Sequence, residues 1–405
     1  MAVTPLIISL SFKKNNINEE GPSEITLYLS PRGIDLFGME LIENFILEYE
    51  EKNPDIKILI MPAVSEAGTP ASDSDDTFQR EPDIYFFDEG DFPAFIAGNY
   101  LAELNAYTHY DSGTLQLAIP LVSFMDLLFY NIDILAAAGF DSPPKTRDQF
   151  LAYVRAVSGG STGASGFALS LGRDDMRALS RDIFSWIWAA GNSFWADDGS
   201  PSLETRSIIN DFSFFGSLYR EGLLAPEVFN LTGSQRIEQF AQGKIAMMIA
   251  SAQAIPYLKE KIGDDKFGIT IIPSPITEGG YGINISSIYA GMSSASAYPD
   301  EAWDFLVFLA EKSSFLCENF KAIPGIAVNI IPGNYVNDDP FYSKAWGIYE
   351  FARTVNSFSD KPGAVDYYES FLDELEVFFD SSRTAAQTVT ALQQRWNEIY
   401  GKTMN

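Results

Sequence analysis

The stretch ELIENFILEYEEKNPDIKILIM, residues 40–61, predicts a helix followed directly by a strand. Four apolar side chains recur at the spacing i, i+3, i+4 and i+7, which forms one buried helical face: Ile42, Phe45, Ile46 and Tyr49. Asn53-Pro54 ends this helix, because the residue before a proline avoids the helical backbone region. Residues 56–61 are then apolar and β-branched, as expected for a short buried strand.

The same alternation continues on both sides of this stretch. Further strands are expected at 25–30, 83–87, 245–249 and 267–272, and further helices at 204–221 and 234–242. Another helix is expected to start at Arg147, with Thr146 as its N-cap, because the Thr146 hydroxyl can accept a free backbone N–H. The strand, helix, strand order implies a parallel sheet with crossover helices, so the fold class is α/β. With 405 residues, the chain is long enough for two or three domains at roughly 100–200 residues each.

The charge balance restricts the partners that the protein can have. The chain has 55 acidic and 27 basic residues, which gives a formal net charge of −28. Such a surface repels phosphate backbones, so nucleic acid is not expected as a partner. One cysteine and one histidine exclude a disulfide scaffold and a zinc site of the Cys/His type. We therefore expect no metal and no cofactor.

The N-terminal residues are treated apart from the fold. No apolar run reaches the roughly 18–20 residues that span a bilayer. Residues 3–12 are mostly apolar, but Lys13 and Lys14 follow them, whereas the cations of a secretory signal precede its apolar stretch. Residues 1–24 are therefore expected to be a leader or tether.

Two motifs could indicate catalysis or metal binding. Residues 159–163, GGSTG, match the G-x-S-x-G nucleophile elbow, but a helix is expected before them where the elbow needs a strand, so a loop is predicted. Asp73, Asp75 and Asp76 lack the glycine and the glutamate of an EF-hand loop and indicate a solvated loop. His109 lies in a polar segment and is expected at the surface. No acid lies in an evident apolar setting that would raise its pKa, which argues against an enzyme.

Five phrases, in order along the chain, resemble extracellular solute-binding protein family 1, the carbohydrate-binding proteins of ABC importers that are similar to maltose-binding protein. They are ELIENFILEYEEKNPDIKILIM at 40–61, PDIYFFDEGDFPAFIAGNYLAEL at 82–104, IPLVSFMDLLFYNIDILAAAGFDSPPKTRDQF at 119–150, FAQGKIAMMIAS at 240–251 and PDEAWDFLVFLA at 299–310. Each phrase alone is weak, whereas five in the right order are specific for the family but not for the ligand. Arg147 stands where this family usually has a tryptophan.

The resemblance implies a two-lobed, periplasmic-binding-protein-like α/β fold of type II, with the lobes joined by hinge strands. The N-terminal lobe would hold residues 25–130 and 268–320, and the C-terminal lobe residues 131–267 and 321–405. The ligand would bind in the cleft between the lobes, outside the carboxyl ends of the strands, and hinge motion would close the cleft on it.

The resemblance also implies a set of ligand-binding residues. Those nearest the N-terminus end or follow the strands expected at 25–30 and 83–87: Ser30, Arg32, Asp35, Phe87, Asp88 and Glu89. The others are spread over the rest of the chain: Phe124, Asp126, Trp186, Trp188, Gln253, Tyr367 and Tyr368. The aromatic rings would stack on sugar rings, while carboxylates and amides would bind hydroxyls. Gln253 stands where some relatives have tryptophan, and Arg32 would also suit an acidic or phosphorylated ligand.

The function that follows is that of an extracytoplasmic substrate-binding protein of an ABC importer. The protein would be a monomer that binds a mono- or oligosaccharide and is recognised by permease subunits in the membrane. It would catalyse no reaction. It would be periplasmic or a membrane-anchored lipoprotein, although the lipobox cysteine is absent from this chain, whose one cysteine is Cys317. Two alternatives stay open: a glycan hydrolase that uses paired carboxylates, and a ligand sensor for a membrane receptor.

Overall fold

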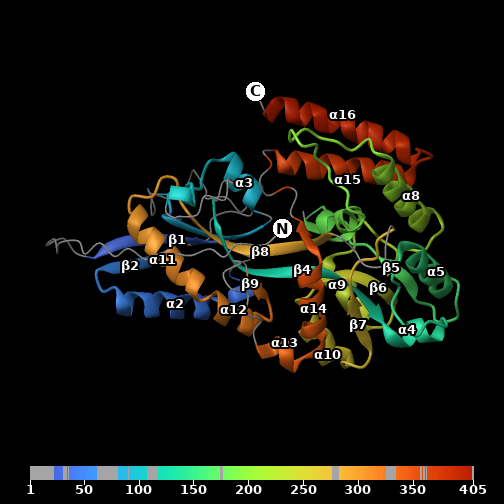
Figure 1. Ribbon diagram of the computed structural model, residues 1–405, viewed down its shortest axis with the longest axis horizontal. Coiled ribbons are helices and arrows are strands. Elements are labelled where there is room, and N and C mark those ends of the chain that lie inside the picture. Colours follow the sequence, from blue (N-terminus) through green and yellow to red (C-terminus); the bar gives the residue numbers. More distant parts are fainter. Residues whose placement is uncertain are drawn as a thin grey trace. The chain divides into compact units, whose positions relative to one another are not determined.

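In the computed structural model, the chain has an α/β fold that divides into two units (Figure 1). The structure describes residues 22–30, 34, 36–61, 81–89, 91–106, 117–173, 177–275, 282–324, 334–355, 358, 361 and 363–403. Unit 1 comprises residues 1–123 and 286–333, and unit 2 comprises residues 124–285 and 334–405. The first two crossings between the units lie inside strands β4 (Ile119–Asn131) and β8 (Gly282–Met292). The sequence places the first boundary at residue 130, near the end of β4.

Unit 1 is built on a sheet whose strands the sequence largely predicts. Strand β1 (Ser23–Leu29) lies between β2 (Ile56–Met61) and β3 (Ile84–Asp88) and is parallel to both. Strand β8 pairs with β3 in the antiparallel direction, with Phe87 opposite Tyr289. Helix α2 (Met39–Lys52) connects β1 to β2 and buries the four apolar residues of the predicted stripe. Both this helix and the strand after it are confirmed.

The core of unit 1 lies on both faces of β3, whose five residues are all buried. Tyr85 and Phe87 pack with Phe95 of helix α3 (Phe92–Ala97), while the Phe86 ring contacts that of Phe37 at a centroid distance of 5.1 Å. Successive side chains of a strand point to opposite faces, so the four residues of β3 that precede Asp88 need largely apolar side chains on both faces. Helices α11 (Pro299–Glu311) and α12 (Ser313–Phe320) also belong to this unit, and α11 packs on α2.

The strands of unit 2 pair in both parallel and antiparallel directions. Strand β6 (Ile245–Ser251) pairs parallel with β5 (Ser165–Ala168) and antiparallel with β4. Strand β7 (Phe267–Thr270) is antiparallel to β4, and the short β10 (Arg353–Val355) is parallel to β8. The four residues of β6 that begin at Ala246 are fully buried, which fits a strand that is covered on both faces.

Helices cover the unit 2 sheet (Figure 1), and several begin at caps that the sequence contains. Thr146 caps α5 (Arg147–Ser158) as predicted, because its hydroxyl accepts the Gln149 N–H at 3.2 Å. The larger helices that follow are α8 (Arg206–Arg220), α9 (Gly233–Ala241), α10 (Ala254–Ile262), α15 (Ala364–Asp380) and α16 (Ala385–Thr403). The remaining elements of the chain are η1 (Leu104–Ala106), α4 (Ile132–Ala137), α6 (Arg177–Leu179), η2 (Ser180–Phe184), α7 (Ser185–Ala189), β9 (Ile323–Pro324), α13 (Asn334–Asp338) and α14 (Pro340–Phe351).

Arg147 is a buried structural residue of unit 2. Its guanidinium pairs with Asp211 of α8 and donates to the Trp186 carbonyl oxygen at 2.7 Å. Burial raises the pKa of Asp211 to about 6, although the pairing with Arg147 acts in the opposite direction. An ion pair therefore occupies the position at which the resemblance implies a tryptophan.

None of the described helices is long and apolar enough to cross a membrane. Four of the residues singled out in the sequence for their chemistry lie outside the described residues: Asp73, Asp75, Asp76 and His109. Residues 159–163 are described, and they form turns between α5 and β5, as expected for a loop.

Candidate ligand-binding site

In unit 1, polar candidates lie where the parallel strands β1 and β3 end. Ser30 follows β1, is buried, and donates its backbone N–H to the Phe86 carbonyl oxygen at 2.8 Å. Asp88 is the last residue of β3 and Glu89 follows it, with 7% of Asp88 exposed. The carboxyl ends of parallel strands are where ligands of open α/β sheets bind. Two further candidates, Arg32 and Asp35, lie outside the described residues.

The structure corrects the expectation that Phe87 offers a stacking face to a sugar. The Phe87 side chain has no exposed area, and its ring stacks on Phe95 at a centroid distance of 4.6 Å. Its other contacts include the ring of Tyr289 on β8, at 5.7 Å. Phe87 is therefore part of the unit 1 core, because burying its large apolar surface there stabilises the fold.

Three aromatic candidates of unit 2 are corrected in the same way. Trp186 has no exposed area, Trp188 has 2% and Tyr367 has 1%. The Trp186 ring lies 4.7 Å from that of Phe150, and the Tyr367 ring lies 5.0 Å from that of Trp396. All three belong to the main apolar cluster of unit 2. Their sequence context gives no sign of this, since a ring in a helix next to a loop can lie on either face.

The side chains of Tyr368 and Phe124 are also partly or largely buried. Tyr368 is half-buried and shares a hydrogen bond with Ser180, with 2.6 Å between the two hydroxyl oxygens. Phe124 is 4% exposed and lies on β4, directly after the first crossing between the units. Tyr368 remains a candidate for a ligand contact, whereas the Phe124 ring is largely covered.

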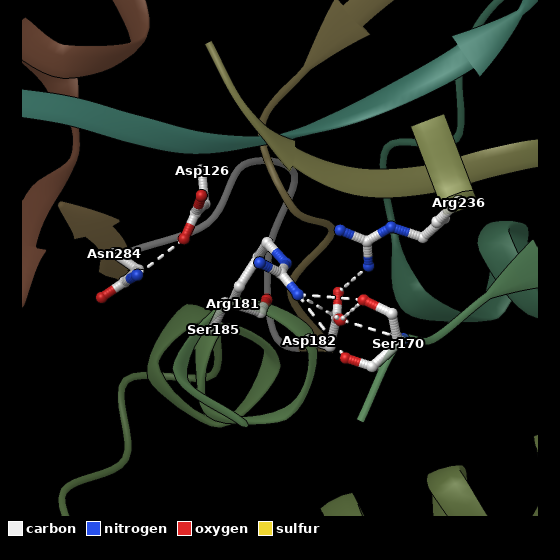
Figure 2. Close-up of polar contacts among 7 residues, drawn as sticks. All are labelled: Asp126, Ser170, Arg181, Asp182, Ser185, Arg236 and Asn284. Atoms are coloured by element: carbon white, nitrogen blue, oxygen red, sulfur yellow. Dashed lines mark hydrogen bonds and ion pairs between the residues drawn. The ribbon is translucent and has the colours of Figure 1, made fainter. Parts of the chain in front are cut away.

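Unit 2 contains a buried cluster of charged side chains, shown in Figure 2. Asp182 has no exposed area and pairs with Arg236 of α9, which is 1% exposed. Asp182 Oδ2 also accepts hydrogen bonds from the Ser170 N–H at 3.1 Å and from Arg181 Nη2 at 3.2 Å. A buried charge has a large desolvation cost unless it is paired and hydrogen-bonded, and the charges of this cluster are both. Burial lowers the pKa of Arg236, and the negative charge of Asp182 opposes this effect.

Arg181 and Asp182 belong to a π-helical turn, η2, which lies between α6 and α7. Figure 2 shows the Arg181 guanidinium directed toward Asp182 and Ser170, and Arg181 Nη2 donates to Ser170 Oγ at 3.0 Å. Ser185 closes this turn by donating its hydroxyl to the Arg181 carbonyl oxygen at 2.5 Å. Wide turns of this kind occur frequently at functional sites. The Arg181 side chain keeps 14% of its surface exposed, unlike those of Asp182 and Arg236.

Asp126, a predicted ligand residue, lies at the edge of this cluster. Asn284 Nδ2 donates to Asp126 Oδ2 at 2.6 Å, and this hydrogen bond links β4 to β8 close to both crossings between the units (Figure 2). Burial raises the pKa of Asp126 to about 6, while the positive charge of Arg181 and the bond from Asn284 act to lower it. The expectation that no acid lies in an apolar setting is therefore wrong.

Gln253 is one of the candidates that the structure leaves partly exposed. It follows β6, whose last residue, Ser251, lies opposite Asp126 in the strand register. The Gln253 side chain is half-buried and lines a groove of unit 2 together with residues of α9 and α10. Its amide can donate and accept hydrogen bonds, as binding of a sugar hydroxyl requires.

Sequence reasoning missed five residues of the polar cluster: Ser170, Arg181, Asp182, Arg236 and Asn284. One of them carried a usable signal, because Arg236 precedes Phe240 by four residues and therefore shares its buried helical face. A charge on an apolar helix face indicates a buried partner. Among the described residues, no group of three or more His, Cys, Asp or Glu side chains could hold a metal ion.

Comparison with known families decides the identity of the fold. The family model described as bacterial extracellular solute-binding protein matches residues 39–314, more than half of the chain. The chain belongs to this family. The resemblance inferred from the five sequence phrases is thereby confirmed, and so is the two-lobed α/β fold class, because solved solute-binding proteins share this fold.

Two solved structures illustrate this fold. Maltose-bound T. maritima MalE3 superimposes with a TM-score of 0.70 at 17% identity, covering 93% of this solute-binding protein and 99% of that chain. The cyclic alpha-maltosyl-1,6-maltose binding protein of Arthrobacter globiformis gives a TM-score of 0.73 at 19% identity, covering 94% and 100%. In sequence, a binding protein of Brucella abortus (strain 2308) is 27% identical over 198 residues, which are 48% of this chain and 46% of that relative.

Proposed function

We propose that this solute-binding protein is the extracytoplasmic substrate-binding protein of an ABC importer and that it binds a mono- or oligosaccharide. The observation that carries the proposal is the family match over residues 39–314. The proteins named above bind maltose and a cyclic maltosyl-maltose, and their fold covers more than nine-tenths of this chain. The permease subunits, a periplasmic or lipid-anchored location and a monomeric state belong to the same proposal.

The proposed ligand contacts are polar groups at strand ends. In unit 1 they are Ser30, Asp88 and Glu89, which follow or end parallel strands. In unit 2 they are Asp126, Gln253 and Tyr368, and the partly exposed Arg181 is added to them. Carboxylates, amides and hydroxyls can each accept or donate the hydrogen bonds that sugar hydroxyls make. Arg32 and Asp35 stay in the proposal on the resemblance alone.

Glycan hydrolysis is the weaker proposal on the geometry of unit 2. Asp126 has a raised pKa, as a general acid would. Asp182 is the other carboxylate whose charge raises the pKa of Asp126, but it is fully buried and paired with Arg236 and Arg181. A carboxylate held in this way has no free face for a water molecule or a sugar, so a hydrolytic pair is not formed by these two acids.

Calorimetric titration of the purified protein with a panel of neutral sugars tests the proposal, with small-angle scattering to follow hinge closure. We expect heat of binding with at least one sugar and a smaller radius of gyration in its presence. The absence of binding to every sugar of the panel, or release of chromophore from aryl glycosides, would contradict the proposal. Lack of compaction with a tightly bound sugar would overturn only the hinge-closure part.

A further inference from the structure

A groove of about 810 Å³ lies on unit 2, beside the helices that flank β6. Helix α9 packs against both β6 and α10 (Figure 1). The groove is lined by residues of these three elements, of the loop that precedes α9 and of the turn after α9: Glu227, Leu231, Ser234, Gln235, Ile237, Glu238, Gln239, Gln242, Lys244, Ser251, Gln253, Ala254 and Tyr257. A volume of this size is within the range of roughly 300–1,000 Å³ that small-molecule sites occupy.

The lining is unusually rich in uncharged polar groups. Four of the residues are glutamines, two are serines and one is a tyrosine, whereas large aliphatic side chains are few. The charged lining residues are Glu227, Glu238 and Lys244, so the carboxylates outnumber the cations. The excess of carboxylates disfavours an anion, and the amide and hydroxyl groups can bind the hydroxyls of a neutral ligand. A neutral ligand that is covered with hydroxyl groups suits it best.

Part of this polar surface is already committed to the fold. Gln235 Oε1 accepts the Thr232 N–H at 3.0 Å as part of the α9 capping box. Glu238 accepts hydrogen bonds from Gln242 Nε2, at 2.8 Å, and from the Tyr257 hydroxyl. These bonds hold the side chains in place, so the wall of the groove is organised before a ligand arrives.

Two amides of the groove stay available. The Gln239 and Gln253 side chains are half-buried and make no hydrogen bond to any residue that the structure describes. Each amide offers donors and an acceptor in one plane, which matches a pair of neighbouring hydroxyls. Tyr257 adds an aromatic ring to the same groove, and Lys261 Nζ lies 5.6 Å from its centroid.

We propose that the groove between α9 and α10 is a binding subsite for a neutral saccharide, with Gln239, Gln253 and Tyr257 as its contacts. This inference rests on the proposed carbohydrate function and deepens it, because a groove of this volume that continues from Gln253 along α9 favours an oligosaccharide over a single sugar. Sugar units at Gln253 would extend over Gln239 and Tyr257. The groove therefore adds affinity for longer ligands and none for a monosaccharide.

The test compares variants of Gln239 with matched variants of Gln394, an exposed glutamine of α16 outside the groove. Gln239→Ala removes the amide, and Gln239→Trp fills the groove, while Gln394→Ala and Gln394→Trp make the same changes elsewhere. Calorimetry with glucose, maltotetraose, cellotetraose and chitotetraose gives the affinities. We expect both Gln239 variants to lower the affinity for the tetrasaccharide that the parent binds most tightly by about tenfold or more. We expect these variants to leave the affinity for glucose unchanged. The Gln394 variants should have the affinities of the parent.

The outcomes separate the two proposals. If the parent binds a tetrasaccharide and the Gln239 variants bind it equally well, the subsite is overturned while the carbohydrate function stands. If the parent binds no sugar of the panel, both proposals fail together. An equal loss of monosaccharide affinity in the Gln239 variants would also overturn the subsite, because it would show a general change of unit 2. Thermal unfolding of each variant confirms that the fold is retained.

Discussion

The buried carboxyl of Asp126 makes the stability of unit 2 depend on pH in an unusual direction. Its pKa is raised to about 6 in the folded protein, from an ordinary value of 3.8. A folded-state pKa above the unfolded one means that the folded state binds the proton more tightly. The protonated carboxyl therefore contributes its full stability at low pH, and this contribution is lost as the pH rises through about 6. This difference in pKa corresponds to a loss of about 3 kcal/mol of unfolding free energy at neutral pH.

Replacing Asp126 by asparagine removes this titration while keeping an oxygen that can accept the Asn284 bond. The unfolding free energy of the Asp126→Asn variant minus that of the parent should rise by about 2 kcal/mol as the pH is raised from about 4 to about 7.5. The charged groups that face Asp126, namely Arg181, Arg236 and Asp182, are unchanged in the variant. The difference therefore isolates the ionisation of the one carboxyl.

Urea titrations at a series of pH values, followed by tryptophan fluorescence, measure the effect. Every tryptophan except Trp303 lies in unit 2, so the signal reports mainly on that unit. Asp141→Asn is the matched control, because it makes the same substitution at an exposed residue in a bend before α5, outside the buried cluster. If the unfolding free energies of the Asp126→Asn variant and the parent differ by the same amount at every pH, the reasoning is refuted.

Three other predictions concern buried residues within unit 1 or within unit 2. Arg147→Ala leaves Asp211 buried without its partner and should cost about 3–5 kcal/mol of unfolding free energy in urea titration; a loss below about 1 kcal/mol would contradict the buried pair. Gly282→Ala should destabilise the fold by about 1–3 kcal/mol, because the added Cβ would lie 2.5 Å from the Trp188 carbonyl oxygen, whereas Gly347→Ala meets no atom within 4 Å and serves as its control in thermal unfolding. Burial raises the pKa of the Cys317 thiol to about 12, so it should resist a thiol reagent at about pH 8 until denaturant is added; rapid reaction of the native protein would show that the thiol is accessible.

Local patterns were sufficient for much of the fold. The helix over α2 was predicted from four apolar residues at helical spacing, and Thr146 was recognised as an N-cap from its position before an amphipathic run. Strand β8 was missed, because its sequence, GINISSIYAGM, mixes glycine, serine and asparagine with its apolar residues. That strand is buried over most of its length, and its tertiary position requires this whatever its local propensity.

The candidate site was less accessible to sequence reasoning. Phe87 and Trp186 were chosen for their rings, but the ring of each is fully buried in the core of its own unit. The choice failed because an aromatic residue at the end of a strand or helix has the same local sequence whether its ring is covered or exposed. Gln253 and Asp126 were chosen from the family resemblance, and the structure places Gln253 in a groove and Asp126 at a buried polar cluster.

The sequence by itself determined the α/β alternation, the family and the acidic surface, because each of these is recorded in short-range order or in composition. Only the tertiary structure decided which buried polar groups meet, since Asp182 and its partner Arg236 are 54 residues apart and Asp126 and its partner Asn284 are 158 apart. Polar groups so distant in sequence interact strongly only when folding brings them within a few ångströms in a medium that water does not screen.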